Sequence, residues 1–301
     1  MIPPEHVPPI PASLLEPLPP VPAGCTRIAL IGDVVGKPGM RMVCNAIPWL
    51  RRLLHIRTVV VNAENAADGS GLRCKDYRRL VEHGVDAITL GDHAFRKREI
   101  MEVLDSQPNI VRAANWPADG PGCSLAIVPI GDGLSMAVTT AVGRVFMKPV
   151  DCPFRAVDRI LAEVAPEVSI RLMDFHAEAT SDMQLMGRHL DGRVTAVLGT
   201  HTHVATADEQ ILPMGTGFQC DVGMTGPFQS ILGRKIEAVH TATIKGVPLP
   251  FQVATEDVRL NGTWFDAHME TGKCMQIGRI HWRESLIDQF VAQAQRDRQV
   301  L

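Results

Sequence analysis

The sequence predicts an α/β protein, a layered sandwich with mixed sheets. Three observations support this. Apolar runs of strand length alternate with amphipathic runs of helix length from residue 27 to about residue 205. Strands such as RIALIGDVV are apolar throughout instead of alternating, which is typical of sheets that helices cover. After about residue 210 the pattern is strand-rich, which requires a mixed sheet or a second sheet.

The first half of the chain contains three strand–helix units. We expect strands where β-branched residues cluster between turn residues, and helices where apolar residues recur every three or four positions. The strands are expected at 27–35, 57–65 and 86–95, and the helices at 40–54, 74–84 and 97–106. Short strands follow at 109–115 and 124–130, and IGDG at 130–133 predicts a hairpin turn into a strand at 134–142.

The second half continues with a helix at 154–165, a strand at 169–178, a helix at 181–190 with Ser or Asp near its N-cap, and a strand at 194–203. The strand-rich portion comprises 215–223, 238–244, 250–260 and 273–283. A polar helix at 284–298 closes the chain.

Composition limits the domain organisation and the class of partner. Residues 1–24 are proline-rich and are expected to be a disordered tail, so 25–301 is expected to be the folded domain. A hydrophobic content of 46% supports a full core, and a net charge of −3 with interspersed signs excludes a basic footprint for duplex nucleic acid or a membrane. The seven cysteines are scattered and never spaced as CxxC, which favours a reducing cytoplasm. The alternative that the chain assembles into a homo-oligomer stays open.

Polar side chains that can bind metals recur where the predicted strands end. Carboxyl ends of parallel strands meet at one edge of a sheet, where ligands bind. Taken alone, each residue has a structural alternative: Asp33 as a helix cap, His93 as a surface or N-cap residue, His176 as a core histidine. Their convergence favours a site composed of Asp33, Glu64, Asn65, Asp92, His93, His176, His201 and His203.

The types of ligand indicate the metal. Carboxylates, one amide and several imidazoles without a thiolate suit Mn, Fe, Zn or Ni better than Ca or Mg alone. The set exceeds what one tetrahedral ion needs. Two divalent transition-metal ions sharing a carboxylate would use it fully, as in phosphatases and nucleases.

Several segments are specific to one known family: IGDVVGKPG, VNAENAADGSGL, ITLGDHAF, RAANWP, the long block from DFHAEATSDMQ to CDVGMTGP, and LGR at 232–234. With them the sequence resembles the calcineurin-like metallophosphoesterases, and within these the YmdB-like bacterial branch of 2′,3′-cyclic-nucleotide 2′-phosphodiesterases. The resemblance covers roughly residues 26–280 and implies an α/β/β/α sandwich.

The resemblance also implies roles. Asp33, Glu64, Asn65 and His203 would hold one ion, and Glu64, Asp92, His176 and His201 the other, with Glu64 bridging. A metal-bridging hydroxide would attack a small phosphodiester such as a 2′,3′-cyclic nucleotide, and His93 would protonate the leaving oxygen.

The sequence also predicts roles for Asp92, Asn115 and Glu178. The family usually has Asn where this chain has Asp92, and this third carboxylate is expected to tighten metal retention. Asn115 in RAANWP is expected to line the cleft and meet substrate, and Glu178 to orient a ligand histidine.

Two alternative functions stay open: a phosphomonoesterase or 5′-nucleotidase on the same site, and a regulatory protein that keeps the metals but acts through RNA or a partner.

Overall fold

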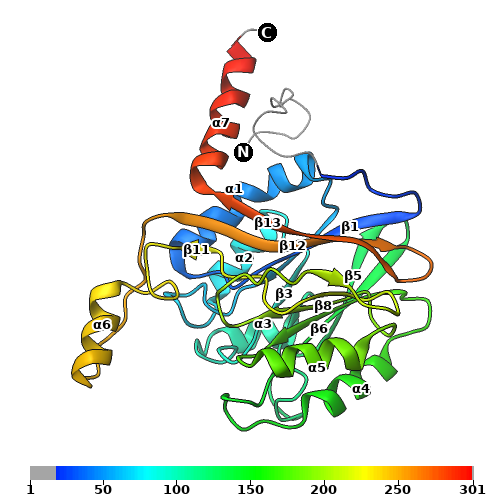
Figure 1. Ribbon diagram of the computed structural model, residues 1–301, viewed down its shortest axis with the longest axis horizontal. Helices are drawn as coiled ribbons and strands as arrows, with labels where there is room; N and C mark the ends of the chain where they lie inside the picture. The colour runs from blue at the N-terminus through cyan, green and yellow to red at the C-terminus, as the bar shows by residue number, and fades with distance from the viewer. Residues whose placement is uncertain (1–17, 300–301) are drawn as a thin grey trace.

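The computed structural model describes residues 18–299, and two sheets packed face to face form its centre (Figure 1). The first sheet has the order β11-β12-β1-β2-β3-β4, with β13 paired to β12. Strands β1 to β4 are parallel, and β12 runs antiparallel to β1. The bounds are β1 Cys25–Ile31, β2 Thr58–Asn62, β3 Ala87–Thr89, β4 Ile110–Val111, β11 Gly226–Pro227, β12 Val258–His268 and β13 Cys274–Arg283.

The second sheet has the order β5-β6-β7-β8-β10-β9. Its inner strands β6, β7, β8 and β10 are parallel, whereas β5 and β9 pair antiparallel at the edges. The bounds are β5 Leu125–Gly131, β6 Leu134–Val142, β7 Ile170–His176, β8 Ala196–Thr200, β9 Gln210–Ile211 and β10 Gly217–Gln219.

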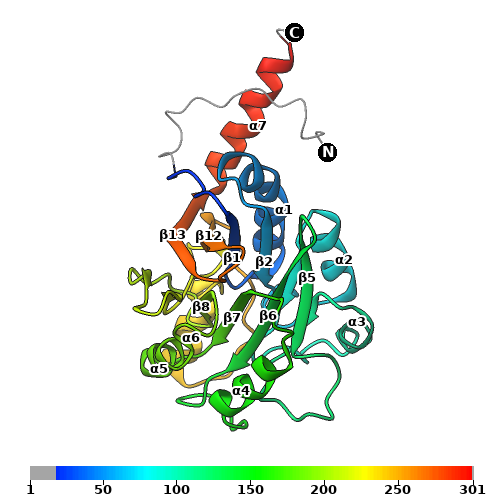
Figure 2. The ribbon, with the colours of Figure 1, turned by 90° about the vertical axis from the view of Figure 1, so that its right-hand side faces the viewer.

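Helices cover the outer face of each sheet, as Figure 2 shows from the side. The first sheet packs against α1 (Gly36–Leu53), α2 (Cys74–Glu82), α3 (Ile100–Ser106) and α7 (Glu284–Gln299). The second packs against α4 (Pro153–Glu163) and α5 (Thr180–Leu190). Strand β1 shows how the layers arise: Ile28 and Leu30 face the core between the sheets, and Ala29 and Ile31 face the helices. The four-layer α/β/β/α prediction is confirmed.

One predicted strand is a helix. The segment 238–244 lies within α6, Ile236–Lys245, which has no buried residue and projects from the body (Figure 1). Its β-branched residues favour a strand, but strand preference depends on a neighbouring strand to pair with. On this projecting arm residues 236–245 have no neighbouring strand to pair with among the described residues, so they form a helix. Gly246 ends that helix in the left-handed conformation at φ 65°.

Other boundaries also differ from the prediction. Only Val258–Leu260 of the predicted strand 250–260 belongs to β12, and that strand continues to His268 through Gly262. A Cβ at Gly262 would lie 2.5 Å from the Leu30 carbonyl oxygen, so glycine permits close pairing with β1 here. Helix α5 begins after Ala179 without a side-chain cap. Asp182 instead accepts hydrogen bonds from the backbone N–H groups of Arg144 and Val145.

Most of the predicted tail, residues 1–17, lies outside the described residues. Just beyond them, Leu18 packs against the helix-covered side of the first sheet, and the Pro19 carbonyl accepts a hydrogen bond from Arg27 at 2.8 Å. The division at residue 24 stays a prediction. Within residues 18–299, every helix is too short or too polar to cross a bilayer.

A buried ion pair between β1 and β12 gives a stability prediction. Both Asp266 oxygens accept hydrogen bonds of 2.7 Å from the guanidinium of Arg27, which also stacks 4.3 Å from the Trp264 ring. Replacing Asp266 with alanine leaves a buried unpaired cation, so we expect a loss of about 3–5 kcal/mol in the free energy of unfolding. Urea denaturation measures it. Glu284→Ala, which breaks a half-exposed pair with Arg41, is the control and should cost less than about 1 kcal/mol.

Candidate metal centre

The candidate residues follow the carboxyl ends of five parallel strands. Asp33 comes shortly after β1, Glu64 and Asn65 after β2, and Asp92 and His93 after β3, all in the first sheet. In the second sheet, His176 ends β7, and His201 and His203 follow β8. Contacts join the two groups, since the His201 backbone N–H donates to Asp33 Oδ2 at 3.0 Å. The structure therefore brings together residues that lie up to 170 positions apart, as His203 does with Asp33.

One group has ligand atoms close enough to share an ion. One ligand atom each from Glu64, Asp92, His176 and His201 lies within 4.8 Å of all the others. His176 Nε2 is 3.2 Å from Glu64 Oε1, 3.4 Å from Asp92 Oδ1 and 3.0 Å from His201 Nδ1. Glu64 and His176 are almost fully buried. This arrangement matches the set expected for the second ion.

A second group adjoins the first through Glu64. His203 Nε2 lies 3.9 Å from Asp33 Oδ1 and 3.2 Å from the Asn65 amide nitrogen, which also donates to Glu64 Oε1 at 3.3 Å. Glu64 thus touches both groups, as a bridging carboxylate must. The Asn65 amide oxygen faces His93, so Asn65 would ligate a cation through oxygen only after its amide turns over.

The outer nitrogen of each candidate ligand histidine has a partner. His176 Nδ1 lies 2.8 Å from Thr200 Oγ1, which donates to the buried Asp174 at 2.7 Å. His201 Nε2 lies 3.1 Å from Glu178, and His203 Nδ1 lies 3.2 Å from the Leu232 carbonyl oxygen. Such partners fix the ring and its tautomer, leaving the inner nitrogen free to bind metal. The expectation that Glu178 orients a ligand histidine matches this contact.

Two buried carboxylate oxygens show that cations fit the cluster. Asp33 Oδ1 and Asp92 Oδ1 are buried and accept no hydrogen bond from the described residues. A carboxylate oxygen buried without a hydrogen bond is costly, and a divalent cation suits clustered carboxylates and imidazoles. The helix-cap alternative for Asp33 is wrong, because α1 begins after Val35 without a side-chain cap.

Electrostatics support the same assignment. Burial raises the pKa of Asp33, and the nearby Glu64 carboxylate adds to the rise. Burial alone would lower the pKa of His176, but the carboxylates of Glu64 and Asp92 hold it well above its usual value. These carboxylates thus favour a positive charge at this position, and a metal ion would bind here in place of the imidazole proton. Burial lowers the pKa of His203 to about 4, so this imidazole is neutral at pH 7, as a metal ligand must be.

His93 occupies a different position, at the edge of the cluster. Its Nδ1 lies 2.8 Å from the Asn65 amide oxygen, and its backbone N–H donates to Glu64 Oε2 at 2.9 Å. Its side chain keeps 26% of its surface exposed. Because Nδ1 is engaged, Nε2 is the nitrogen left to meet a substrate.

Asn115 is held by backbone groups. Its amide nitrogen donates to the carbonyl groups of Val142 and Asp151, and its oxygen accepts from the Val142 N–H. The side chain is buried, so these contacts favour a role in fixing the chain near residues 142 and 151. Thr200 and Asp174 were not predicted from the sequence. Both lie one or two positions before a candidate histidine, which is the only signal that could have found them.

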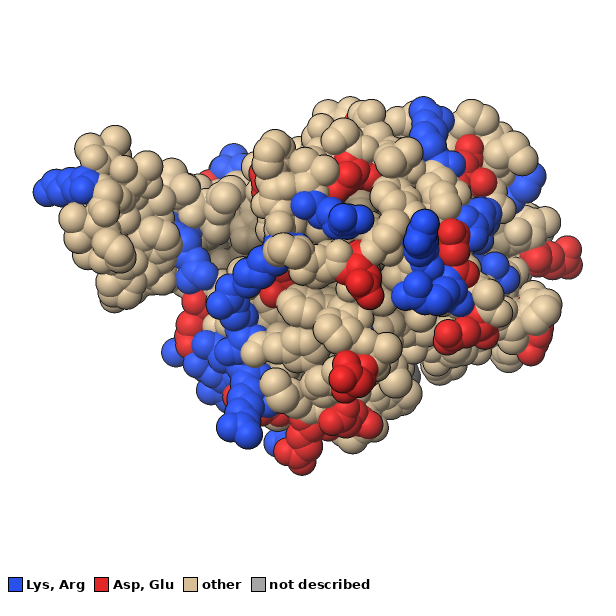
Figure 3. Space-filling view, turned by 90° about the horizontal axis from the view of Figure 1, so that it is seen from below, with Lys and Arg blue, Asp and Glu red and all other residues tan. Residues whose placement is uncertain are grey.

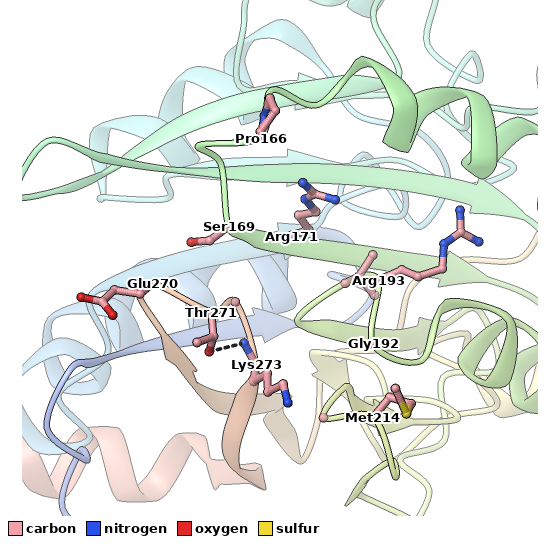
Figure 4. A pocket seen from close by; sticks show the side chains of 12 residues that line it. Pro166, Ser169, Arg171, Gly192, Arg193, Met214, Glu270, Thr271 and Lys273 are labelled. Atoms are coloured by element: carbon pink, nitrogen blue, oxygen red, sulfur yellow. Dashed lines mark hydrogen bonds between the residues drawn. The ribbon is translucent and has the colours of Figure 1, made fainter.

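The cavity in Figure 4 lies at the opposite ends of these strands and lacks the features of the cluster. It encloses about 250 Å³ beside the start of β7 and β8. Its basic side chains diverge: Arg171 and Arg193 point away from Lys273, and Arg193 pairs with Asp158 at 2.7 Å. The candidate centre is therefore the carboxyl-end cluster.

The sandwich and the cluster define a metallophosphoesterase-type protein. More closely, the chain belongs to the YmdB-like protein family, whose sequence model matches residues 29–280. It is 44% identical over 254 residues to the 2′,3′-cyclic-nucleotide 2′-phosphodiesterase of Bacillus subtilis (strain 168), covering 84% of this chain and 96% of that protein. It is 30% identical to a putative phosphatase/phosphodiesterase of Mycoplasma genitalium, over 84% of this chain and 92% of the relative.

Solved structures give the same result. A hypothetical protein from Thermus thermophilus superposes with a TM-score of 0.81 at 40% identity, over 86% of this chain and 100% of the other. A novel phosphatase from Mycoplasma pneumoniae superposes with a TM-score of 0.80 at 29% identity, over 88% and 96%. The resemblance read from the sequence is confirmed.

Proposed function

We propose that this protein is a metal-dependent phosphodiesterase that hydrolyses small phosphodiesters, with 2′,3′-cyclic nucleotides as its substrate class. The observation that carries the proposal is the cluster around Glu64, whose carboxylate lies 3.2 Å from His176 of the second sheet and 3.4 Å from His93 of the first. The Bacillus subtilis relative, which this chain covers almost completely, supports the substrate class.

The donor set supports a pair of divalent ions. Asp33, Glu64, Asn65 and His203 would hold one, and Glu64, Asp92, His176 and His201 the other; Mn, Fe and Zn suit these ligands. When bound, such a pair supplies an activated water and positive charge for the phosphoryl oxygens. The seven cysteines, all free thiols, support our placement of the enzyme in the reducing cytoplasm.

His93 serves as the general acid in this proposal. When Asn65 turns its oxygen toward the ion, its amide nitrogen would donate to His93 Nδ1, which places the ring proton on Nε2. That proton passes to the 2′ oxygen as its bond to phosphorus breaks. Water supplies the oxygen that joins phosphorus, and the product is a 3′-phosphomonoester. The imidazole regains its proton from solvent, since its side chain is partly exposed.

A small anionic substrate suits the surface. On the face drawn in Figure 3, groups of basic side chains are interrupted by acidic and uncharged ones. Such a surface can attract a small anion locally without offering the continuous basic track that a duplex needs.

Turnover of 2′,3′-cyclic AMP tests the proposal. We expect release of 3′-AMP by the Mn²⁺-loaded protein and faster hydrolysis of bis(p-nitrophenyl) phosphate than of p-nitrophenyl phosphate. Faster turnover of the monoester would support the phosphomonoesterase alternative. Absence of turnover for every ester with Mn²⁺, Fe²⁺ and Zn²⁺ would support the regulatory alternative.

Asp92 gives a prediction about metal retention. Its carboxylate adds a negative charge beside His176, and Asp92→Asn removes that charge with little change of shape. We expect the variant to bind Mn²⁺ at least about tenfold more weakly, because charge interactions at contact distance amount to several kcal/mol even when screened. Chelator competition measures the affinity. Equal affinity in parent and variant would show that Asp92 does not contribute its charge to the centre.

A further inference from the structure

The loop that carries His201 and His203 has an unfavourable backbone conformation. His201 has φ 107° and His203 has φ 66°, although neither is glycine. Such conformations persist only where surrounding contacts determine them, and they concentrate at functional sites. The residue between them, Thr202, therefore has to be held by something outside the loop.

Asp221 provides that hold. This residue follows β10, and its side chain is fully buried. Its Oδ2 accepts hydrogen bonds from the Thr202 backbone N–H at 2.8 Å and from Thr202 Oγ1 at 2.9 Å. Its Oδ1 accepts one from the Gly223 N–H at 2.7 Å. Both oxygens are thus engaged by neutral donors.

The segment around Asp221 is itself fixed against the strand that leads to Asp33. A Cβ on Gly32 would lie 1.7 Å from the Gly223 carbonyl oxygen, so the two backbones touch. The Thr225 N–H donates to the Asp33 carbonyl at 2.9 Å. Asp221 therefore connects the histidine loop to the part of the chain that places Asp33.

Burying a carboxylate without a cationic partner is costly, and burial raises the pKa of Asp221. Among residues 18–299, no Lys, Arg or His forms an ion pair with it. A carboxylate accepts two donors on one oxygen and a third on the other, which an amide cannot do, because its nitrogen would face a donor. The geometry thus requires an acidic residue here.

We propose that Asp221 is a positioning residue of the metal centre, which holds Thr202 so that the imidazoles of His201 and His203 both face the carboxylates. This inference rests on the proposed function, since it assumes that these histidines bind metal. It explains the CDVGMTGP segment, whose acidic residue, within residues 18–299, forms no hydrogen bond or ion pair with the proposed ligand side chains but binds Thr202 of their loop.

Metal affinity of the Asp221→Asn variant tests the inference. We expect Mn²⁺ binding, measured by chelator competition on folded protein, to weaken about 10- to 100-fold, as is typical when a partner of the ligands is lost. Asp191→Asn is the matched control. Asp191 also holds a loop through backbone N–H groups, those of Met214 and Thr216, but at the other end of the second sheet. Its variant should bind Mn²⁺ as the parent does.

Thr202 provides a second variant in case Asp221→Asn does not fold. Thr202→Val removes one donor and should weaken Mn²⁺ binding several-fold, whereas Thr202→Ser should restore it. Parental affinity in folded Asp221→Asn, or in Thr202→Val if the first variant is unfolded, would overturn the inference. If the parent itself binds neither Mn²⁺ nor Zn²⁺, the proposed metal centre fails instead.

Discussion

Glu64→Gln is expected to lower kcat/KM for 2′,3′-cyclic AMP by about a thousandfold or more. Glu64 contacts both candidate groups, since its oxygens meet His176, Asn65 and the His93 N–H. Loss of its charge should remove or misplace both ions, whose stabilisation of the transition state is worth several kcal/mol. Steady-state kinetics and the metal content per chain measure the two effects.

The control for this variant is Glu163→Gln, which makes the same chemical change on the exposed surface of α4. It should retain parental activity and metal content. If Glu64→Gln kept its metal and lost less than about tenfold in kcat/KM, Glu64 would not be the bridging ligand.

His93→Ala is expected to lower kcat for 2′,3′-cyclic AMP by about 10² to 10⁴-fold, the usual contribution of a general acid. Its metal content should not change, because His93 lies at the edge of the cluster with Nδ1 on Asn65. The effect should depend on the leaving group: p-nitrophenolate leaves without a proton, so hydrolysis of bis(p-nitrophenyl) phosphate should fall much less. Parallel kinetics on the two substrates check this.

His189→Ala is the matched histidine control, since His189 pairs with Asp158 on the surface of α4 and α5. It should behave as the parent does on both substrates. An equal loss on both substrates for His93→Ala would contradict its role as proton donor. If His93→Ala abolished all hydrolysis while the protein kept its role in the cell, the regulatory alternative would be favoured.

The gathering of the candidate residues could be predicted from sequence because it follows from strand direction. Asp33, Glu64 and Asp92 each come two or three positions after a parallel strand, and such strands end at one edge. Spacing alone therefore predicted which residues meet, including a histidine pair from the second sheet. That these residues bind metal stays a prediction.

What sequence could not predict depends on contacts between distant segments. The hydrogen bonds of Asn115 involve β6 and residue 151, and only the fold shows that they occupy its amide. The sequence around Asp221 is typical of a turn, and only the structure shows that its carboxylate accepts a hydrogen bond from the Thr202 N–H. Helix α6 was misread because β-branched residues indicate a strand only where a neighbouring strand is present.

We infer that loops far apart in the chain assemble one two-metal centre around Glu64. Anomalous diffraction from crystals grown with Mn²⁺ tests it most directly. We expect two peaks, one between Asp33 and His203 and one between His176 and His201, with Glu64 touching both. A single peak, or peaks away from these side chains, would contradict it.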